Sequence, residues 1–480
     1  MRTSLRTLVF VLVSCLPLLA REPLRLHPEN LHYFLFRDKP TVIVTSGEHY
    51  GAVLNLDFNY AHYLETLSRD GLNCTRTFSG AYCEHPSAFS IASNTLAPLP
   101  GRYVTLWARS KVPGYANSGN KFDLTQWDKA YFKRLTDFVS EASRRGVIVE
   151  MNLFCPFYEE SMWRLSPMNA INNINNVGNV ARTNVYTLDK NGGLLLVQEA
   201  MVRKLVTELK DFDNLYYEIC NEPYFGGVTL EWQGRIADVI LETEAKLGVR
   251  HLISQNIAND KAVVEKPHPG VSIFNFHYAS PPDTVAMNYG LQKVIGDNET
   301  GFRGTNDGPY RMEAWDFMVA GGGLFNHLDY SFVAGFENGT FVYPASQPGG
   351  GNPLLRRQFK FLQDTLKSFD FVHMRPGNDN IKAELPAGVS VRALVQDTGD
   401  CLVYVRSGPD RDNKNVKTRF EAGEIALKVT LPAGKFQIEW LDTTGCRVAE
   451  KQVLAHNGGA YLLKAPGFQD DIGLAIRPYR

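Results

Sequence analysis

Two glutamates stand where short apolar runs end. Glu222 lies in the string Ile-Cys-Asn-Glu-Pro at residues 219–223, and Glu299 lies in Gly-Asp-Asn-Glu-Thr-Gly at residues 296–301. Each string follows a run rich in β-branched and aromatic residues, which is typical of a buried strand. Because proline cannot donate to a sheet and glycine interrupts regular structure, both strands are expected to end here. The sequence thus predicts two carboxyl groups at the ends of two different strands.

A pair of carboxyl groups in this position is suited to the cleavage of a glycosidic bond. One group, expected to be Glu222, must carry a proton for the leaving oxygen, which requires burial or a nearby negative charge to raise its pKa. The other, Glu299, must be ionised so that it can attack the sugar, and Asp297, Asp307 and Glu313 are the neighbouring carboxyl groups that compete for this role. Cleavage with retention of configuration requires a separation of about 5–5.5 Å.

The elements that must hold these groups alternate regularly between strands and helices. This alternation, between residues 41 and 369, predicts a (β/α)8 TIM barrel with enlarged loops. The alternative is an open doubly wound sheet, which normally carries a Gly-x-Gly-x-x-Gly string that is absent here. Apolar residues recur at helical spacing over 127–142, with Asp123 as the expected N-terminal cap. The predicted strands are 41–45, 73–78, 147–152, 215–219, 251–255, 271–276, 293–296 and 324–329.

These strings together resemble clan A of the glycoside hydrolases, and most of all its family 5 cellulase-like enzymes. In that clan an Asn-Glu pair follows the fourth barrel strand and a second glutamate follows the seventh, as the residues at 221–222 and Glu299 do in the predicted strand order. The segment Asp-Gly-Leu-Asn-Cys-Thr-Arg at 70–76 resembles the family segment whose arginine lies under the nucleophile. His277 and Tyr278, at the end of the sixth strand, resemble the family's His and Tyr beside the two glutamates.

The resemblance implies a role for each of these side chains. Arg76 is expected to keep the nucleophile ionised and oriented, and Asn221 to donate to the sugar 2-hydroxyl. Tyr278 is expected to hydrogen-bond the nucleophile, and His277 to bind a hydroxyl group or to order the acid. The alternatives are an ordinary ion pair for Arg76 and a satisfied core histidine for His277.

Aromatic side chains are expected to stack on the apolar faces of sugar rings. Trp163 lies in the long stretch 153–193 after the third predicted strand, which is expected to wall the cleft. The family usually carries a tryptophan after the eighth strand, but this chain reads Asn-His-Leu-Asp-Tyr at residues 326–330. Tyr330 or Asp329 is expected in its place, and this departure concerns the identity of the substrate more than the type of reaction.

The chain is expected to consist of a leader and two domains. Residues 1–20 combine Arg2 and Arg6 with an apolar run and a final small residue, which predicts a signal peptide and export. Residues 21–371 are assigned to the catalytic barrel. In residues 372–480, short strands alternate with Gly, Pro, Asp and Asn turns, which predicts an all-β sandwich. This domain is expected to brace the barrel, and carbohydrate binding is the alternative.

Export, if it occurs, allows two kinds of modification at the cysteines. The string that ends in Cys15 also fits a lipoprotein cleavage site, so a lipid anchor at Cys15 is the minority interpretation. Six cysteines follow the leader, and an exported protein can form disulfides. The expected pairs are Cys401 with Cys446, the only two in the C-terminal region, and Cys74 with Cys83, which would close a short loop.

Composition and missing motifs exclude other classes of protein. A net charge of -1 argues against nucleic acid or an anionic membrane as a partner, whereas a neutral carbohydrate fits it. The sequence has no Cys-x-x-Cys, His-x-x-x-His, His-Glu-x-x-His or Gly-x-Ser-x-Gly string, so no metal, cofactor or serine nucleophile is expected. We therefore predict a retaining hydrolase of β-linked poly- or oligosaccharides. A non-catalytic carbohydrate-binding barrel and an exo-acting glycosidase on a side-chain sugar are the alternatives.

Overall fold

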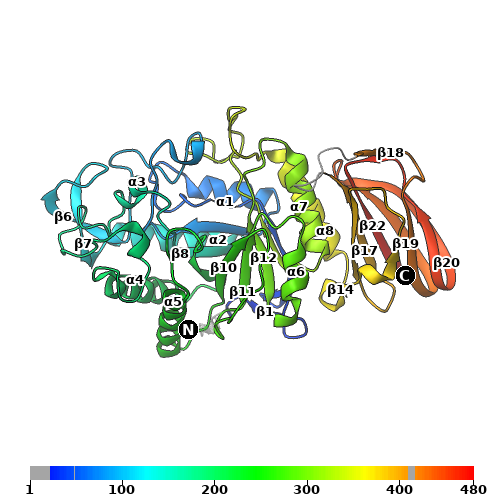
Figure 1. Ribbon diagram of the computed structural model, residues 1–480, viewed down its shortest axis with the longest axis horizontal. Helices are drawn as coiled ribbons and strands as arrows, with labels where there is room; N and C mark the ends of the chain where they lie inside the picture. The colour runs from blue at the N-terminus through cyan, green and yellow to red at the C-terminus, as the bar shows by residue number, and fades with distance from the viewer. Residues whose placement is uncertain (1–21, 48, 409–416, 480) are drawn as a thin grey trace, which may run out of the picture.

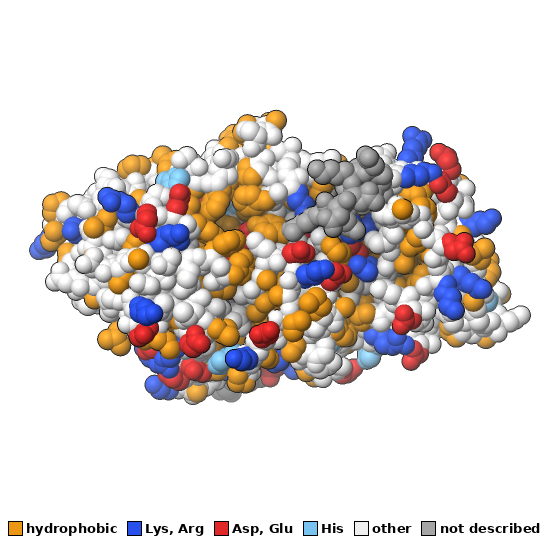
Figure 2. All heavy atoms as spheres, viewed as in Figure 1, with side chains coloured by type: hydrophobic (Ala, Val, Ile, Leu, Met, Phe, Trp, Pro, Cys, Tyr) orange, Lys and Arg blue, Asp and Glu red, His pale blue; other side chains and the backbone are white. Residues whose placement is uncertain are grey.

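The computed structural model describes residues 22–47, 49–408 and 417–479. A barrel and an all-β region lie side by side along the long axis of the molecule (Figure 1). Charged side chains of both signs are interspersed over the face seen in Figure 2, which agrees with the balanced net charge. The predicted signal peptide and Cys15 lie outside the described residues. Within the described ranges, no helix is long and apolar enough to cross a membrane.

The larger region is a (β/α)8 barrel, as predicted. Its eight strands are parallel and pair in the order β4-β13-β12-β11-β10-β9-β8-β5. The ring is completed by the segment after β4, where the Arg76 amide donates to the Gly47 carbonyl and the His49 amide donates to the Arg76 carbonyl, at 2.9 and 2.8 Å. Each predicted strand overlaps one of these. They are β4 (Ile43–Thr45), β5 (Cys74–Phe78), β8 (Ile148–Phe154), β9 (Leu215–Cys220), β10 (Ile253–Asn259), β11 (Ile273–His277), β12 (Val294–Glu299) and β13 (Leu324–Asn326).

Amphipathic helices cover the outside of the barrel, and α2 (Lys129–Arg144) illustrates why they form. Its buried residues recur at three- and four-residue steps. Its cap is Asp128, whose carboxylate accepts from the amides of residues 130 and 131. The prediction of Asp123 was wrong, because Asp123 belongs to strand β7 (Asn120–Trp127) of a hairpin that precedes the helix. The remaining α-helices of the described residues are α1 (Tyr60–Arg69), α3 (Glu160–Trp163), α4 (Leu194–Leu209), α5 (Leu230–Leu247), α6 (Asp283–Asn288), α7 (Asp307–Val319) and α8 (Pro353–Lys367). Of these, α3 is a short turn in the loop after β8, and α7 is buried between the barrel and the C-terminal region.

The amino-terminal end of the barrel is filled by apolar side chains. A small antiparallel sheet of β1 (Arg25–Leu26), β2 (Phe34–Phe36) and β3 (Lys39–Thr41) precedes the first barrel strand. Its side chains pack against the first residues of the barrel strands, so a site has room only at the carboxyl end. The cluster consists of Leu24, Phe34, Phe36, Ile43, Cys74, Ile148, Tyr216, Leu252, Ile273, Val294 and Leu324.

The C-terminal region is all-β, as predicted. One antiparallel sheet has the order β14-β16-β17-β22-β19-β15, with β20 added beside β19, and β18 pairs with β21. Turns between neighbouring strands and alternating buried residues give this region its own apolar core. The strands are β14 (Arg375–Pro376), β15 (Ile381–Lys382), β16 (Val389–Val395), β17 (Cys401–Ser407), β18 (Arg419–Phe420), β19 (Ala426–Asp442), β20 (Arg447–Lys464), β21 (Phe468–Gln469) and β22 (Asp471–Pro478).

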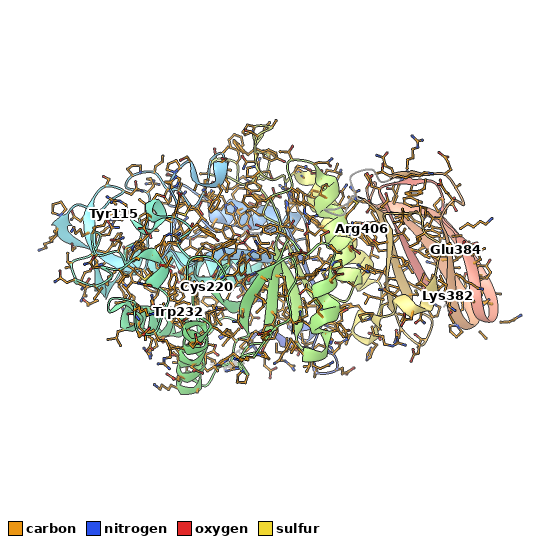
Figure 3. All side chains as sticks on the ribbon, viewed as in Figure 1. Tyr115, Cys220, Trp232, Lys382, Glu384 and Arg406 are labelled. Atoms are coloured by element: carbon orange, nitrogen blue, oxygen red, sulfur yellow. The ribbon has the colours of Figure 1, made fainter. Side chains whose placement is uncertain are left out.

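The β-region packs against α7 through buried aromatic and charged side chains. The rings of Trp315 and Tyr404 stack with centroids 5.5 Å apart. Arg406, labelled at this junction in Figure 3, donates to the carboxylate of Asp316 at 2.6 Å. These partners are buried, so separating the two regions would leave a buried charge without its partner, which is costly. The arrangement agrees with the expected role of the β-region as a brace.

Neither predicted disulfide is present, because all six cysteines of the described residues are free. Cys74 begins β5 and Cys83 lies beyond its other end, so a strand of five residues, about 16 Å long, separates them. In the β-region, Cys401 lies in register with Ile438 through β22, whereas Cys446 lies in the turn after β19 ends. Both separations exceed the roughly 4.4–6.8 Å between Cα atoms that a disulfide spans.

Candidate active site

Glu222 lies just after β9, in a cavity at the carboxyl ends of the barrel strands. Its backbone has φ of 35°, a value that is rare for a residue with a side chain and that often marks functional sites. One carboxylate oxygen accepts from the Tyr158 hydroxyl at 2.5 Å. The other lies 3.2 Å from Nδ1 of His277 and accepts from the Tyr224 hydroxyl at 3.3 Å. The side chain is therefore held in place while one edge faces the cavity.

Glu299 ends β12 and lies among donors. Tyr278 donates to its Oε1 at 2.6 Å, and Arg76 donates to its Oε2 at 3.1 Å. The Tyr50 hydroxyl also donates to Oε2. Burial by itself would raise the pKa of this carboxyl, but the His277 ring, the Arg76 guanidinium and the two tyrosine hydroxyls together lower its pKa to about 2.

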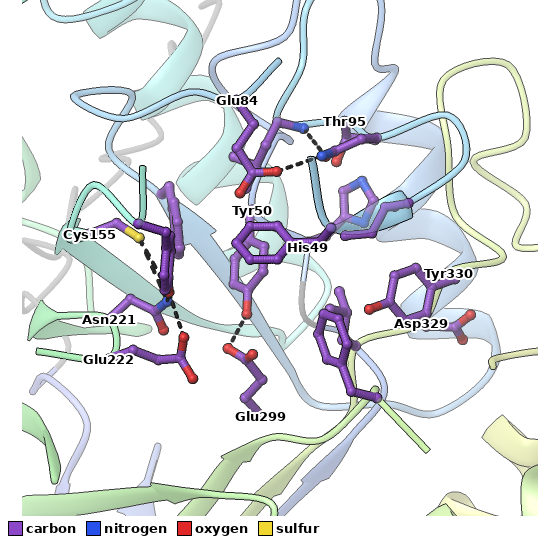
Figure 4. A pocket seen from close by; sticks show the side chains of 18 of the residues that line it. His49, Tyr50, Glu84, Thr95, Cys155, Asn221, Glu222, Glu299, Asp329 and Tyr330 are labelled. Atoms are coloured by element: carbon purple, nitrogen blue, oxygen red, sulfur yellow. Dashed lines mark hydrogen bonds between the residues drawn. The ribbon is translucent and has the colours of Figure 1, made fainter. Parts of the chain in front are cut away.

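The two carboxylates face each other across a short gap. One oxygen of Glu222, one of Glu299 and a ring nitrogen of His277 all lie within 4.8 Å of one another. Figure 4 shows the two glutamates side by side beneath Tyr50. Three such ligand atoms could also approach a metal ion, but the Arg76 guanidinium already supplies the positive charge beside Glu299. The site is therefore a pair of carboxylates beside a protein cation, the guanidinium of Arg76.

Below this pair lies a buried polar layer inside the barrel. Arg76 is fully buried; it donates to Oδ1 of Asn221 at 2.7 Å and pairs with Glu218 and, at 3.6 Å, with Glu150. Asn298 donates to Glu218 at 2.7 Å and to Glu150 at 2.8 Å. A buried cation is tolerated because several acceptors surround it. This network fixes Arg76, and therefore also the position of the Glu299 carboxylate.

The carboxylate pair lies in a cavity of about 380 Å³. Asn221, Tyr278 and Tyr330, for which the sequence predicts contact with the substrate, line it. His277 contacts Glu222 but does not line the cavity. Asp329 also lines it, but its carboxylate is bound by Arg356 at 2.8 Å. Further lining residues are His49, Tyr50, Phe78, Glu84, Phe89, Ile91, Ala92, Ser93, Asn94, Thr95, Leu96, Cys155, Tyr158, Phe225, Asn259, Phe302, Leu328, Phe332 and Val333.

Trp163 does not reach the cavity, so the prediction of a sugar platform there was wrong. Its side chain is 2% exposed, its indole nitrogen donates to the Val180 carbonyl at 3.0 Å, and its ring packs on Phe157. Of the stretch 153–193, only the first residues line the cavity, among them Tyr158. Residues 172–175 of this stretch bond to the hairpin formed by β6 (Trp107–Pro113) and β7 (Asn120–Trp127), where the Phe122 amide donates to the Asn172 carbonyl.

Sequence reasoning missed three groups that the structure brings to the site. Tyr50 and Tyr158 donate to the two glutamates, and Glu84 faces the same cavity from the loop after β5. Tyr50 and Tyr158 each follow a barrel strand, which is a usable signal. Glu84 lies in the stretch 79–106, where no periodicity marks it.

The comparisons with known proteins agree with this geometry. Residues 102–303 match the model of the cellulase family, glycosyl hydrolase family 5. The chain contains a glycosyl hydrolase family 5 domain. No curated protein sequence matches the chain. The domain makes the protein an O-glycosyl hydrolase, and its partner a carbohydrate substrate.

Solved structures similar to this hydrolase cover nearly its whole length. A family 5 glycoside hydrolase from Bacteroides vulgatus ATCC 8482 is 14% identical with a TM-score of 0.61, over 96% of this chain and 95% of its own. A candidate glycoside hydrolase from the same organism is 13% identical with a TM-score of 0.64, over 95% and 82% of the two chains. At this identity the likeness concerns the fold, which includes the β-region beside the barrel.

Proposed function

We propose that this hydrolase cleaves β-glycosidic bonds in poly- or oligosaccharides with retention of configuration. The observation that carries the proposal is the short separation of the carboxylates, with one oxygen of Glu222 and one of Glu299 within 4.8 Å. Retaining enzymes need about 5–5.5 Å between their carboxyl groups, whereas inverting enzymes need roughly 6.5–9.5 Å to admit a water. The gap supports a nucleophile and an acid on the same bond.

In the first step Glu299 attacks the anomeric carbon while Glu222 gives its proton to the glycosidic oxygen. The bond between carbon and oxygen breaks, the alcohol leaves, and the sugar is esterified to Glu299. In the second step Glu222 takes a proton from water, the water oxygen attacks the anomeric carbon, and the ester bond breaks. Both carboxyl groups return to their starting states, and the sugar keeps its configuration.

The environment of each carboxyl group supports this assignment. Arg76 and the hydroxyls of Tyr278 and Tyr50 stabilise the ionised form of Glu299, so it is ready to attack. Glu222 has only hydroxyl donors and the His277 ring beside it, with no arginine or lysine within bonding distance among the described residues. Asn221 lines the cavity beside the acid, and its Nδ2, which donates to the Tyr158 hydroxyl at 3.0 Å, is the group that we propose binds a sugar hydroxyl.

The shape of the site favours exo action on a terminal sugar within this class. The cavity holds about 380 Å³, near the lower end of the roughly 300–1,000 Å³ that is usual for ligand pockets. The loop 79–106 and the start of the stretch 153–193 wall it on two sides. A long polysaccharide chain bound along its length would need an open cleft.

The test is a panel of aryl glycosides and polysaccharides followed by proton NMR, so that the anomer of the first product is seen. We expect the retained anomer. An inverted first product would contradict the two-step mechanism. Absence of turnover across the panel, from protein shown to be folded, would favour a non-catalytic carbohydrate-binding barrel.

We also propose that the chain is exported. This proposal rests on the sequence of residues 1–20, with its basic start and apolar run. The mass of the mature protein recovered from the producing cells tests it. A chain lacking these residues is expected, and a lipidated Cys15 would instead support the anchor.

A further inference from the structure

The mouth of the active-site cavity is formed by phenylalanines. Phe89, Phe225 and Phe302 line the cavity and are nevertheless 41%, 43% and 42% exposed. In Figure 2, hydrophobic side chains gather around a hollow near the centre of the view. Exposed aromatic side chains in contact with one another usually mark a binding surface.

These rings form an arc that starts at the proposed acid. Phe225 lies 5.8 Å from the ring of Tyr158, and Tyr158 lies 5.2 Å from Phe89. The arc continues from Phe89 to Phe302 at 6.4 Å and from Phe302 to Tyr330 at 6.3 Å. Tyr158, which lies between Phe225 and Phe89 in this arc, also donates its hydroxyl to Glu222. The apolar surface is therefore continuous with the proton donor.

The position of the acid decides which part of a substrate meets this arc. Glu222 must reach the glycosidic oxygen, because that oxygen receives its proton. A sugar bound over Arg76, Tyr278 and Glu299, where hydrogen-bonding groups are concentrated, puts its leaving group on the Glu222 side of the glycosidic oxygen. On that side Phe225 and Phe89 flank Tyr158. Phe302 lies between the two sides, because its ring also contacts that of Tyr278 at 6.1 Å.

The chemistry of the arc selects against a polar leaving group. A phenylalanine side chain offers no hydrogen bond, and aliphatic residues line the cavity at Ile91, Leu96, Leu328 and Val333, whereas Ser93, Asn94, Thr95 and Asn259 are its polar lining outside the arc. Sugar hydroxyls placed against the phenylalanine rings themselves would lose water without gaining partners, which costs free energy. An apolar group placed here would instead lose unfavourable contact with water.

The ring of Phe89 is held at the mouth by an uncommon backbone conformation. Phe89 and Ser90 both have positive φ, 51° and 59°. Such values are uncommon for residues other than glycine and rarer still for bulky ones. The neighbouring contacts hold Phe89 at the mouth in this conformation, where its ring stands edge-on to Tyr158.

We propose that the natural substrates are glycosides whose leaving group is apolar, either an alkyl chain or an aromatic ring system. The inference rests on the proposed retaining cleavage of a β-glycosidic bond and keeps that reaction. It differs in the substrate, because the group on the leaving side of Glu222 is apolar and is not the second sugar of an oligosaccharide.

The test compares methyl, butyl and octyl β-D-glucoside, the same three β-D-mannosides, and the β-1,4-linked disaccharide of each sugar. The alkyl alcohols are similar leaving groups, so only the apolar contact changes along each series. We expect kcat/KM to rise about three- to fourfold per added methylene until the arc is covered. We expect the octyl glycoside to exceed the disaccharide, below the concentration at which it forms micelles.

Variants locate the effect. Phe225→Ala and Phe89→Ala should each reduce the ratio of octyl to methyl kcat/KM by at least about tenfold, through lost apolar contact. Phe336→Ala is the matched control, because Phe336 is 46% exposed and does not line the cavity. Its ratio should equal that of the unmodified protein.

The outcomes separate the two proposals. If methyl glycosides are hydrolysed with retention but chain length has no effect, or the disaccharide is preferred, the apolar leaving group is wrong and the proposed function stands. If neither these substrates nor 2,4-dinitrophenyl glycosides, which need no protonation, are hydrolysed, the proposed function itself is wrong and the inference falls with it.

Discussion

The active-site cavity has two sides that are built differently. Its floor consists of barrel strand ends and carries Glu299, whereas one wall consists of the loop 79–106 and carries Glu84. Both carboxyl groups are buried. On the floor, the His277 ring, the Arg76 guanidinium and two tyrosine hydroxyls outweigh burial and lower the pKa of Glu299 to about 2. On the wall, burial raises the pKa of Glu84 to about 7, and donors from Asn94 and Tyr82 offset it only in part.

The difference shows that burial alone does not decide the charge of a carboxyl group in this cavity. What decides it at Glu299 is the His277 ring, 3.5 Å from its carboxylate, together with the Arg76 guanidinium at 3.1 Å. The floor is thus arranged for an anion that attacks, and the wall for a group that changes charge near neutral pH. Removing a component of either side should change its behaviour in a defined direction.

The largest effect is expected on the floor, from loss of either glutamate of the pair. Glu299→Gln removes the nucleophile and should lower kcat by at least about 10⁴-fold on every substrate. Glu222→Gln should lower it by about 10²–10⁴-fold on substrates whose leaving group needs a proton. Steady-state rates on alkyl glycosides and on 2,4-dinitrophenyl glycosides measure both.

The two variants should differ on the activated substrate. The dinitrophenolate leaves without a proton, so Glu222→Gln should still form the covalent intermediate, which accumulates because the base for the second step is missing. Added azide should restore turnover, since it needs no deprotonation. If azide rescues Glu299→Gln with the product pattern expected of Glu222→Gln, the two roles are reversed.

A smaller effect is expected from one donor of the floor. Tyr278→Phe removes the hydrogen bond to Oε1 of Glu299. A hydrogen bond to a charged group is worth about 1.5–3 kcal/mol, which corresponds to about one to two pKa units. Because this donor helps to keep the pKa of Glu299 low, its loss should raise that pKa and move the acidic limb of kcat/KM to higher pH by about the same amount.

The matched control is Tyr33→Phe, at the closed end of the barrel. The Tyr33 hydroxyl has no hydrogen-bond partner among the described residues, so its removal should leave the pH profile unchanged. Rate measurements between about pH 2.5 and 7 compare the variants. An acidic limb that does not move in Tyr278→Phe would show that this hydroxyl does not control the charge of the nucleophile.

The contrast between floor and wall also explains what the sequence could predict. Barrel strands are short runs of β-branched and aromatic residues, and side chains at their carboxyl ends meet at one face. Placing Glu222, Glu299, Arg76 and Tyr278 in order along these strands was therefore sufficient to predict that they lie near one another. The structure brings them into contact, and their catalytic roles stay predictions.

Loops carry no such periodic signal. Trp163 was expected in the cavity because it follows a strand in sequence, but its indole is satisfied by a backbone carbonyl inside the loop. Conversely, Glu84 and Phe89 reach the cavity only through the particular path of the loop after β5, including the positive φ of Phe89. The two predicted disulfides were also wrong, because the number of residues between two cysteines does not give the distance between their Cα atoms when a strand lies between them.

The smallest effect is expected on the wall, from Glu84→Gln. The folded-state pKa of Glu84 lies near 7, above its ordinary value of 4.5, so folding binds a proton there. That contribution to stability is complete below about pH 4.5 and is lost as the pH rises towards 7, at up to about 1.4 kcal/mol per pH unit. Glutamine cannot ionise, so the variant should lose this part of the pH dependence.

Urea unfolding at pH 5, 6 and 7 measures it as the free energy of unfolding of the native protein minus that of Glu84→Gln. This difference should fall by about 1 kcal/mol per unit as the pH rises, whatever the constant effect of the substitution. A difference that stays constant would mean that Glu84 is ionised throughout this range, and that the wall holds its carboxylate as firmly charged as the floor holds Glu299.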